Sequence, residues 1–274
     1  MIINHNMNAM NAHRNMGMNT TAAGKSMEKL SSGLRINRAG DDAAGLSISE
    51  KMRGQIRGLD QASRNSADGI SLIQTAEGAL NETQSILQRM RELAVQGAND
   101  TNVTADRDAI QAEITTLGAE VDRIATTTQF NEKNLLDGTF DGKFQIGANA
   151  DANLTLNVKI ATKMDSATLK VGNGDVKVDT HANAQKSISA VNAAIKTVST
   201  QRSSLGAVQN RLEHTIANLD NASENLQAAE SRVRDVDMAK EMMSFSKNNI
   251  LNQAAQAMLS QANQQPQGVL QLLR

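Results

Sequence analysis

A strict alternation of three- and four-residue steps runs through the C-terminal half of the chain, from Ile188 to Val233. Ten of the fourteen positions on this row are apolar, and alternation sustained over more than three heptads is the signature of a coiled-coil helix. A helix of this length extends over about 70 Å, so we expect shorter helices or other chains to cover it. Arg202 interrupts the row. It is either solvated or fixes the register of the helices, and both interpretations stay open.

Two further helices are predicted in the N-terminal half. Between residues 63 and 97, apolar residues such as Ile73 and Leu80 recur in steps of three and four. A second row of this kind runs from Val103 to Ile124, after a short polar turn. Two helices joined by a short turn are expected to pack antiparallel.

The middle of the chain, about residues 139–180, is the part with β patterns. Apolar and polar residues alternate at residues 144–146 and 154–160, which predicts a β-hairpin. A second, smaller hairpin is predicted from residues 169–171 and 176–178, which flank a glycine-rich turn. The predicted fold class is therefore mainly α, a long antiparallel helical bundle or coiled coil with a small β-hairpin region between its halves.

Apolar helical patterns also occupy both chain ends. The N-terminal residues 1–34 carry apolar side chains at Ile3, Met7 and Met10 and then, after a phase shift, at Met27, Leu30 and Leu34. Residues 245–262 carry a wide, weakly charged apolar stripe. Chain ends are usually solvated and frayed, so apolar patterns there indicate a need for a partner. We interpret both ends as interaction surfaces.

The composition argues against catalysis. Cys is absent, which excludes thiolate chemistry and Cys-ligated metal sites. Trp and Tyr are absent as well. The four His residues do not stand at metal-ligand spacing. Asp41 and Asp42 are adjacent carboxylates, but with Arg35 and Arg38 beside them they fit a helix start or salt bridges better than acid–base chemistry. We expect a protein that is not an enzyme, with no cofactor and no metal.

Charge and hydropathy bear on the partners. The net charge is −1, with acidic and basic residues interleaved, which argues against nucleic acid as a partner. No stretch approaches the roughly 20 apolar residues that a membrane span requires, so we expect no membrane contact. The first residues lack the basic and apolar regions of a cleavable signal peptide.

Several segments resemble bacterial flagellin closely. The first is residues 30–46, with the sequence LSSGLRINRAGDDAAGL. The others are residues 88–96 (QRMRELAVQ), 129–138, 206–214 (GAVQNRLEH), 229–240 (AESRVRDVDMAK) and the closing 253–274. Together they cover both ends of the family pattern and most of this chain.

The resemblance implies a structural subunit that polymerises with itself into the extracellular flagellar filament, which serves motility, after export without a cleavable signal peptide. It implies that residues 1–45 and 235–274 pair as an inner coiled-coil layer and that residues 46–234 form the surrounding helix bundle. The short middle indicates a minimal form without large central domains. Amphipathic ends that lack partners cannot bury enough apolar area alone, so we expect them to become ordered only on assembly.

The terminal patterns and the resemblance together give the expected self-assembly residues. They are Ile3, Met7, Met10, Met27, Leu30, Leu34, Arg35, Asn37, Arg38, Asp41, Asp42, Phe245, Ile250, Leu251, Met258 and Leu259.

The resemblance also implies partners other than the chain itself. Arg89, Leu93 and Glu113 match the surface that the animal Toll-like innate receptor recognises in other flagellins, although packing within or between subunits explains them equally well. The flagellar export chaperone would bind the C-terminal segment, residues 236–274, and the filament cap and junction proteins would contact the subunit in the flagellum.

Two alternatives stay open from the sequence. A hook–filament junction protein of the same export system shares terminal patterns of this kind but would match less well at residues 33–46 and 88–96. An intracellular coiled-coil scaffold would need another protein to cover its apolar ends.

Overall fold

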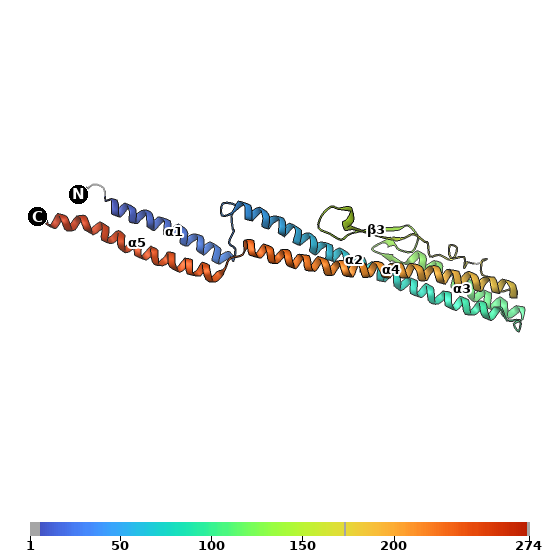
Figure 1. Ribbon diagram of the computed structural model, residues 1–274. Coiled ribbons are helices and arrows are strands. Elements are labelled where there is room, and N and C mark those ends of the chain that lie inside the picture. The colour runs from blue at the N-terminus through green and yellow to red at the C-terminus, as the bar shows by residue number, and fades with distance from the viewer. Residues whose placement is uncertain (1–5, 173, 273–274) are drawn as a thin grey trace. The chain divides into compact units, whose positions relative to one another are not determined.

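The computed structural model describes residues 6–172 and 174–272, with side chains in the last helix described through residue 264. Five helices dominate it, α1 (Met7–Ser32), α2 (Ala43–Gly97), α3 (Thr104–Thr127), α4 (His181–Arg234) and α5 (Met238–Leu272) (Figure 1). Between α3 and α4 lie β1 (Gln129–Phe130), β2 (Lys133–Asn134), β3 (Phe140–Gln145), the short 3₁₀ helix η1 (Ala152–Leu154) and β4 (Thr155–Ile160). The mainly α fold class is confirmed.

The chain divides into two compact units. Unit 1 comprises residues 1–54 and 225–274, and unit 2 comprises residues 55–224. Helices α2 and α4 contribute residues to both units.

In unit 1, polar side chains and one glycine set the helix ends. The Asn6 side chain accepts a hydrogen bond from the Ala9 N–H at 3.1 Å and caps α1. Gly33 ends the helix in the left-handed conformation with φ 73°, where a residue without a Cβ is favoured. Asp42 Oδ1 accepts from the Gly45 N–H at 2.8 Å. Because of this cap, α2 begins at Ala43, about 20 residues before the start that the apolar row predicted.

The core of unit 2 confirms the helical spacing. The predicted α2 positions Ile73, Leu80 and Leu87 are fully buried. On α4, every seventh residue of the predicted row is buried from residue 191 to residue 219. Residues of α3, β3 and β4 complete the same apolar cluster. Long helices are therefore stable in unit 2 because each buries one face along its length.

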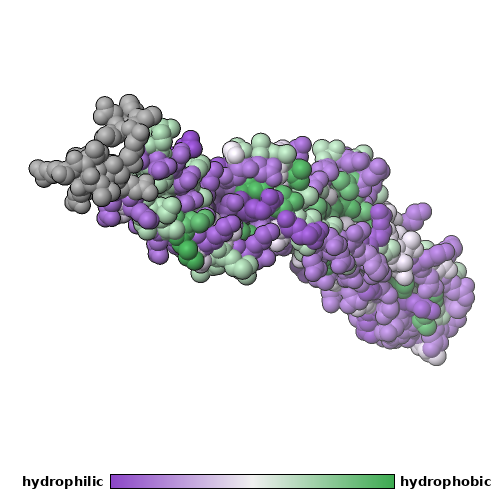
Figure 2. Space-filling view, turned by 60° about the vertical axis from the view of Figure 1, so that its left-hand side comes forward, coloured by the Kyte–Doolittle hydropathy of each residue, from purple (hydrophilic) through white to green (hydrophobic). Residues whose placement is uncertain are grey.

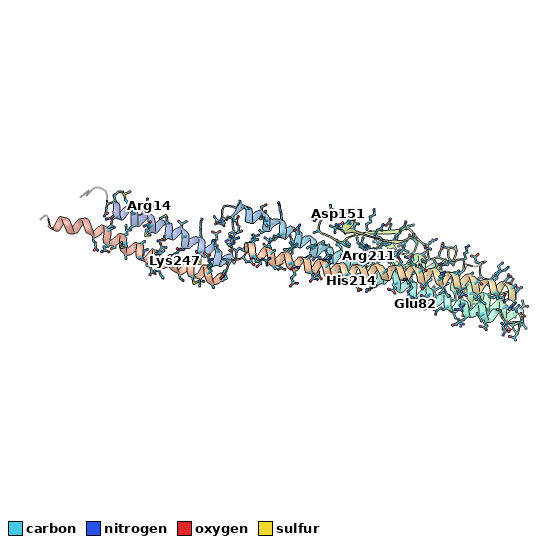
Figure 3. The ribbon with its side chains drawn as sticks, viewed as in Figure 1. Arg14, Glu82, Asp151, Arg211, His214 and Lys247 are labelled. Carbon is cyan, nitrogen blue, oxygen red and sulfur yellow. The ribbon has the colours of Figure 1, made fainter. Side chains whose placement is uncertain are left out.

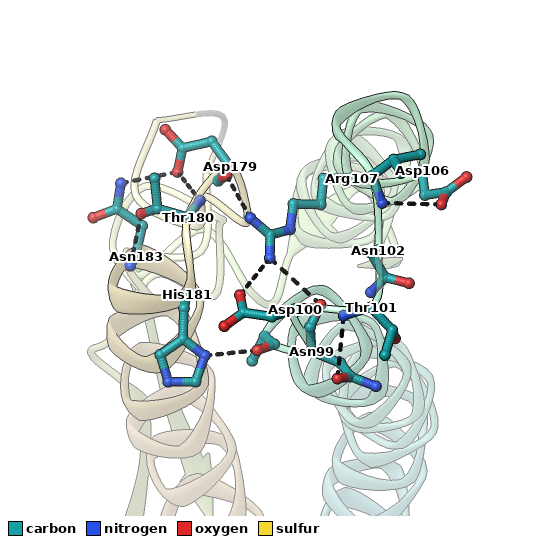
Figure 4. Close-up of polar contacts among 12 residues, drawn as sticks. Asn99, Asp100, Thr101, Asn102, Asp106, Arg107, Asp179, Thr180, His181 and Asn183 are labelled. Carbon is teal, nitrogen blue, oxygen red and sulfur yellow. Dashed lines mark hydrogen bonds and ion pairs between the residues drawn. The ribbon is translucent and has the colours of Figure 1, made fainter.

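Polar contacts close the end of this bundle (Figure 4). Residues 98–103 join α2 to α3, and Arg107 binds both this turn and the segment before α4. Its guanidinium donates to the Asp100 carboxylate at 2.9 Å and to the Asp179 carbonyl at 3.2 Å. The His181 ring lies 2.6 Å from the Ala98 carbonyl oxygen. These contacts hold the start of α4 against the end of α2.

The first predicted hairpin is confirmed. Strands β3 and β4 pair antiparallel, with Phe144 opposite Leu156. Gly142 lies opposite Val158. Leu156, Val158 and Ile160 are buried on the face turned to the core.

The prediction of a second hairpin at residues 169–178 is wrong. Among the described residues of this segment there is no strand, although the turn after Gly172 is present. Its backbone groups form hydrogen bonds with side chains of neighbouring helices instead. Gln111 of α3 donates to the Val176 carbonyl at 3.0 Å and accepts from the Val178 N–H at 3.1 Å. The segment is irregular, with its valines buried, and side chains of α3 and α4 bond part of its backbone.

A smaller hairpin that the sequence did not predict joins β1 to β2. Phe130 pairs with Lys133, and the two residues between them, Asn131 and Glu132, both have positive φ values, 48° and 65°. This is the geometry that tight two-residue hairpins require.

Candidate self-assembly surface

Helices α1 and α5 pack against each other with very little buried side-chain surface. Among their described residues, with α5 followed through residue 264, the buried side chains are Ala23, Ser26 and Ala262. A groove of about 500 Å³ runs between the helices, lined by Asn8, Asn11, Ala12, Asn15, Ala255, Met258, Gln261 and Ala262. The described part of the pair therefore has no apolar core comparable to that of unit 2.

Large apolar side chains of this pair point outward instead. Six of the predicted self-assembly residues are exposed by 40–65%, namely Met7, Met10, Met27, Ile250, Leu251 and Met258. In the space-filling view, hydrophobic side chains reach the surface of this part of the molecule (Figure 2). Leu30, Leu34, Phe245 and Leu259 are half-buried. Ile3 lies outside the described residues.

The outer part of the pair carries few charges. Arg14 is the only Asp, Glu, Lys or Arg between residues 7 and 24, and α5 has none between Lys247 and residue 272. Figure 3 labels both side chains, Arg14 on α1 and Lys247 on α5. The surface is therefore apolar and amide-rich, which suits burial better than a charged helix face does.

Four exposed methionines belong to the same surface and were missed by the sequence prediction. They are Met18, Met238, Met242 and Met243, each exposed by 50–67%. Met238 and Met242 continue the three–four spacing back from Phe245, and Met243 stands seven residues before Ile250. Extending the apolar pattern of residues 245–262 towards the start of α5 would therefore have identified these three.

A backbone bridge joins the connector after α1 to the connector before α5. Leu34 and Asp235 form an isolated antiparallel bridge. The Arg35 N–H donates to the Arg234 carbonyl at 2.6 Å, and the Val236 N–H donates to the Gly33 carbonyl at 3.0 Å. The bridge thus holds the end of α1 next to the start of α5.

The polar residues predicted in the first connector bind one another and the connector backbone. Asp41 Oδ2 accepts from the Asn37 and Arg38 N–H groups at 3.3 and 3.0 Å. The hydrogen bond from Arg38 is the main cause that lowers the pKa of Asp41. Arg35 and Asp42 lie 3.9 Å apart, and the exposed Arg38 pairs with Glu28 at 3.0 Å. As the sequence indicated, the carboxylate pair serves a helix start and salt bridges.

The three residues predicted for receptor recognition lie in two different environments. Arg89 of α2 pairs with Glu113 of α3 at 2.8 Å on the surface, and this hydrogen bond raises the pKa of Arg89. Leu93 is only 2% exposed and belongs to the apolar core. The two charged residues are accessible, whereas Leu93 packs inside unit 2.

Neither a metal site nor a membrane span emerges from the part of the chain that the structure describes. No cluster of three or more His, Asp or Glu side chains there could hold a metal ion. Within the same residues, no helix is both long and apolar enough to cross a bilayer.

Comparison with known proteins identifies the family. Residues 3–141 match the family model of the bacterial flagellin N-terminal helical region, and residues 188–273 match that of the C-terminal helical region. The flagellin of Halalkalibacterium halodurans is 66% identical over 275 residues, and that of Bacillus subtilis is 54% identical over 307 residues. Both alignments cover 100% of each chain.

A solved structure agrees with these relatives. The crystal structure of Bacillus cereus flagellin is 34% identical and superposes with a TM-score of 0.50, covering 61% of this chain and 94% of that one. The alignments with both flagellins span residues 33–46 and 88–96, where a junction protein is expected to match less well. The chain therefore belongs to the bacterial flagellin family and is a structural, non-enzymatic subunit of the extracellular flagellar filament, a homopolymer that serves motility.

Proposed function

We propose that the α1–α5 pair is the surface through which copies of this chain polymerise, and that it becomes ordered only when neighbouring copies cover it. Residues 1–45 and 235–274 would then form the inner layer of the filament, with residues 46–234 around it. The observation that carries the proposal is that ten large apolar side chains of α1 and α5 are at least 40% exposed.

The energetics favour coupling of order to assembly. Fixing one residue's backbone costs roughly 1–2 kcal/mol, and burying one large apolar side chain contributes roughly 1.5–3 kcal/mol. An isolated pair that buries Ala23, Ser26 and Ala262 leaves most of this ordering cost uncompensated. Covering the exposed methionines and Ile250 by neighbouring subunits supplies the missing burial. A head-to-tail contact that does not close then generates an open helical polymer.

The polar connector has a separate role in the same proposal. Arg35, Asn37, Arg38, Asp41 and Asp42 would hold residues 33–42 in the shape that a neighbouring subunit contacts. The Arg38 side chain is 76% exposed although it pairs with Glu28, which supports this role because another copy can contact it.

Deletion of residues 238–274 tests the proposal. The truncated chain should keep the thermal unfolding transition of unit 2 and stay monomeric, because no described side chain of α5 belongs to the core of unit 2. Sedimentation and electron microscopy after salting-out give the readout. Filaments of the truncated chain would contradict the proposal.

A pair of point variants separates loss of apolar surface from loss of the helix. Ile250→Ser with Leu251→Ser removes two exposed apolar side chains, while the control Gln253→Ser with Gln256→Ser changes exposed polar residues of the same helix. We expect the first variant to polymerise poorly and the control to polymerise like the unmodified chain.

We also propose that the subunit leaves the cell through the flagellar export apparatus, with the export chaperone covering residues 236–274 beforehand. The exposed Ile250 and the half-buried Phe245 and Leu259 support this role, because a chaperone would shield the apolar side chains that otherwise associate too early. Filament cap and junction proteins would meet the same surface at the filament ends.

Recognition by the animal Toll-like receptor is a further proposal. Its support is the exposed ion pair of Arg89 and Glu113. Leu93 would act only by positioning α2, since it is buried.

A further inference from the structure

Methionine is the dominant oxidation target in this chain. Cys, Trp and Tyr are absent, while 13 Met are present. The thioether sulfur is readily converted to a sulfoxide, and its rate of reaction follows its exposure. The distribution of exposed methionines therefore decides where an oxidant acts.

The methionines of the two units differ sharply in exposure. On α1, Met7, Met10, Met18 and Met27 are exposed by 52–60%. On α5, Met238, Met242, Met243 and Met258 are exposed by 50–67%. In unit 2, Met90 and Met164 are 0% and 1% exposed.

We propose that the eight exposed methionines of α1 and α5 are oxidation sites of the free subunit, and that their oxidation by peroxide blocks polymerisation while unit 2 stays folded. This inference rests on the proposed function of the α1–α5 pair. Oxidation is the attack of the thioether sulfur on one peroxide oxygen. The O–O bond breaks, an S–O bond forms, the sulfur loses two electrons, and the peroxide is reduced to one water molecule.

The chemical change acts directly on the surface that assembly buries. A sulfoxide is polar and accepts hydrogen bonds, whereas the surrounding surface is apolar and would offer it few donors once neighbouring copies cover it. We expect oxidation to raise the critical concentration for polymerisation by about tenfold or more, the effect of a single buried polar group without a partner. A formed filament covers the same sulfur atoms, so polymer should resist peroxide at concentrations that inactivate free subunits.

The first experiment maps oxidation and assembly in the full chain. Monomer is treated with hydrogen peroxide, and peptide mass spectrometry follows each methionine while sedimentation measures polymerisation. We expect the eight exposed methionines to gain oxygen well before Met90 and Met164, and the critical concentration to rise as they do. Unit 2 should keep its melting temperature. Equal oxidation rates in the two units, or normal assembly with the eight sites oxidised, would overturn the proposal.

Two further measurements show that the sulfoxide is the cause. Treatment of oxidised subunits with methionine sulfoxide reductases should restore assembly. A variant with leucine at all eight positions keeps the apolar surface, since this swap conserves volume, and should assemble equally well before and after peroxide. Two half-variants, with leucine on α1 alone or on α5 alone, should show partial protection. Peroxide sensitivity that persists in the eight-leucine variant would overturn the proposal.

The Ile250→Ser with Leu251→Ser variant separates this inference from the function beneath it. If that variant assembles normally without peroxide, the proposed surface is wrong. If it fails to assemble while the fully oxidised chain still polymerises, only the oxidation proposal is wrong.

Discussion

Arg202 on α4 donates a hydrogen bond to Oε1 of Gln84 on α2, at 2.6 Å from Nη1. Its other terminal nitrogen lies 3.4 Å from Glu77 Oε1. The side chain that interrupts the apolar row of α4 is thus 27% exposed and joined to the neighbouring helix. These bonds support the hypothesis that Arg202 fixes the register between α4 and α2, because a shifted register would separate the partners.

Replacing Arg202 should therefore destabilise unit 2. We expect Arg202→Ala to lower the free energy of unfolding by about 1–2 kcal/mol, since a charged donor loses its partners on another helix. Gln209→Ala is the matched control on the same row. Gln209 bonds only Glu213 of its own helix among the contacts described for it, so its removal should change stability by less than about 0.5 kcal/mol. Urea unfolding measures both, and equal effects would refute the register role.

Gln111 holds the irregular segment that replaces the predicted second hairpin. In Gln111→Ala, the Val176 carbonyl and the Val178 N–H lose the partner that both share, at two residues whose side chains are fully buried. Two buried unsatisfied groups cost about 2–4 kcal/mol. The exposed Gln88→Ala on α2 serves as the control and should shift the urea midpoint little. A loss below about 0.5 kcal/mol in Gln111→Ala would show that the segment does not depend on this contact.

The helical core of unit 2 and the irregular residues 169–178 show which features the sequence predicts and which it does not. Ile73, Leu80 and Leu87 are predicted and buried because helical periodicity is a local property of the chain. Val176 and Val178 alternate like a strand, but their backbone partner is Gln111, 65 and 67 residues away. No local pattern contains that partner.

The early start of α2 and the β1–β2 hairpin are also features that apolar periodicity does not predict. Asn131 is a residue type that favours positive φ, but Glu132, with φ 65°, is not, so the sequence marks this turn only weakly. Helix α2 starts early, at Ala43, because Asp42 caps it. The sequence indicated for Asp42 either a helix start or a salt bridge, without deciding between them. The exposure of the terminal methionines follows from helix pairing, which a single-helix pattern does not include.

Asp165 should make the stability of the protein fall at acid pH. Burial raises the pKa of this carboxyl, but hydrogen bonds from Lys163 and Thr168 and the charge of Lys163 outweigh burial and leave the pKa below its ordinary value. A carboxylate of this kind contributes stability above its unfolded pKa of about 3.9, and the contribution is lost as the pH falls through the lower folded pKa. Asp165→Asn should therefore flatten the fall in melting temperature below about pH 4.

The partner residue offers a second variant for the same measurement. Lys163 Nζ lies 2.7 Å from Asp165 Oδ2. Lys163→Gln should flatten the fall in melting temperature at acid pH less than Asp165→Asn does, because the Thr168 N–H still bonds the carboxylate at 2.9 Å. A fall as steep in Asp165→Asn as in the unmodified chain would contradict the assignment.

Arg89→Ala tests receptor recognition apart from assembly. The ion pair with Glu113 is about half exposed, so its loss should change stability little and leave polymerisation intact. Activation of Toll-like receptor reporter cells should be abolished. The control Arg123→Ala breaks an exposed Arg–Glu pair within α3, between Arg123 and Glu120, and should leave activation unchanged. Full activation by Arg89→Ala would contradict the proposal.

Amide hydrogen exchange on the dilute subunit and on the filament shows whether assembly orders the two chain ends. We expect amides of residues 7–32 and 238–264 to exchange at nearly unfolded rates in the dilute subunit and to become protected in the filament. Amides of the unit 2 core should be protected in both states, because that core is complete within one chain. Strong protection of α1 and α5 in the dilute subunit would contradict the claim that neighbouring copies are needed to order the two ends.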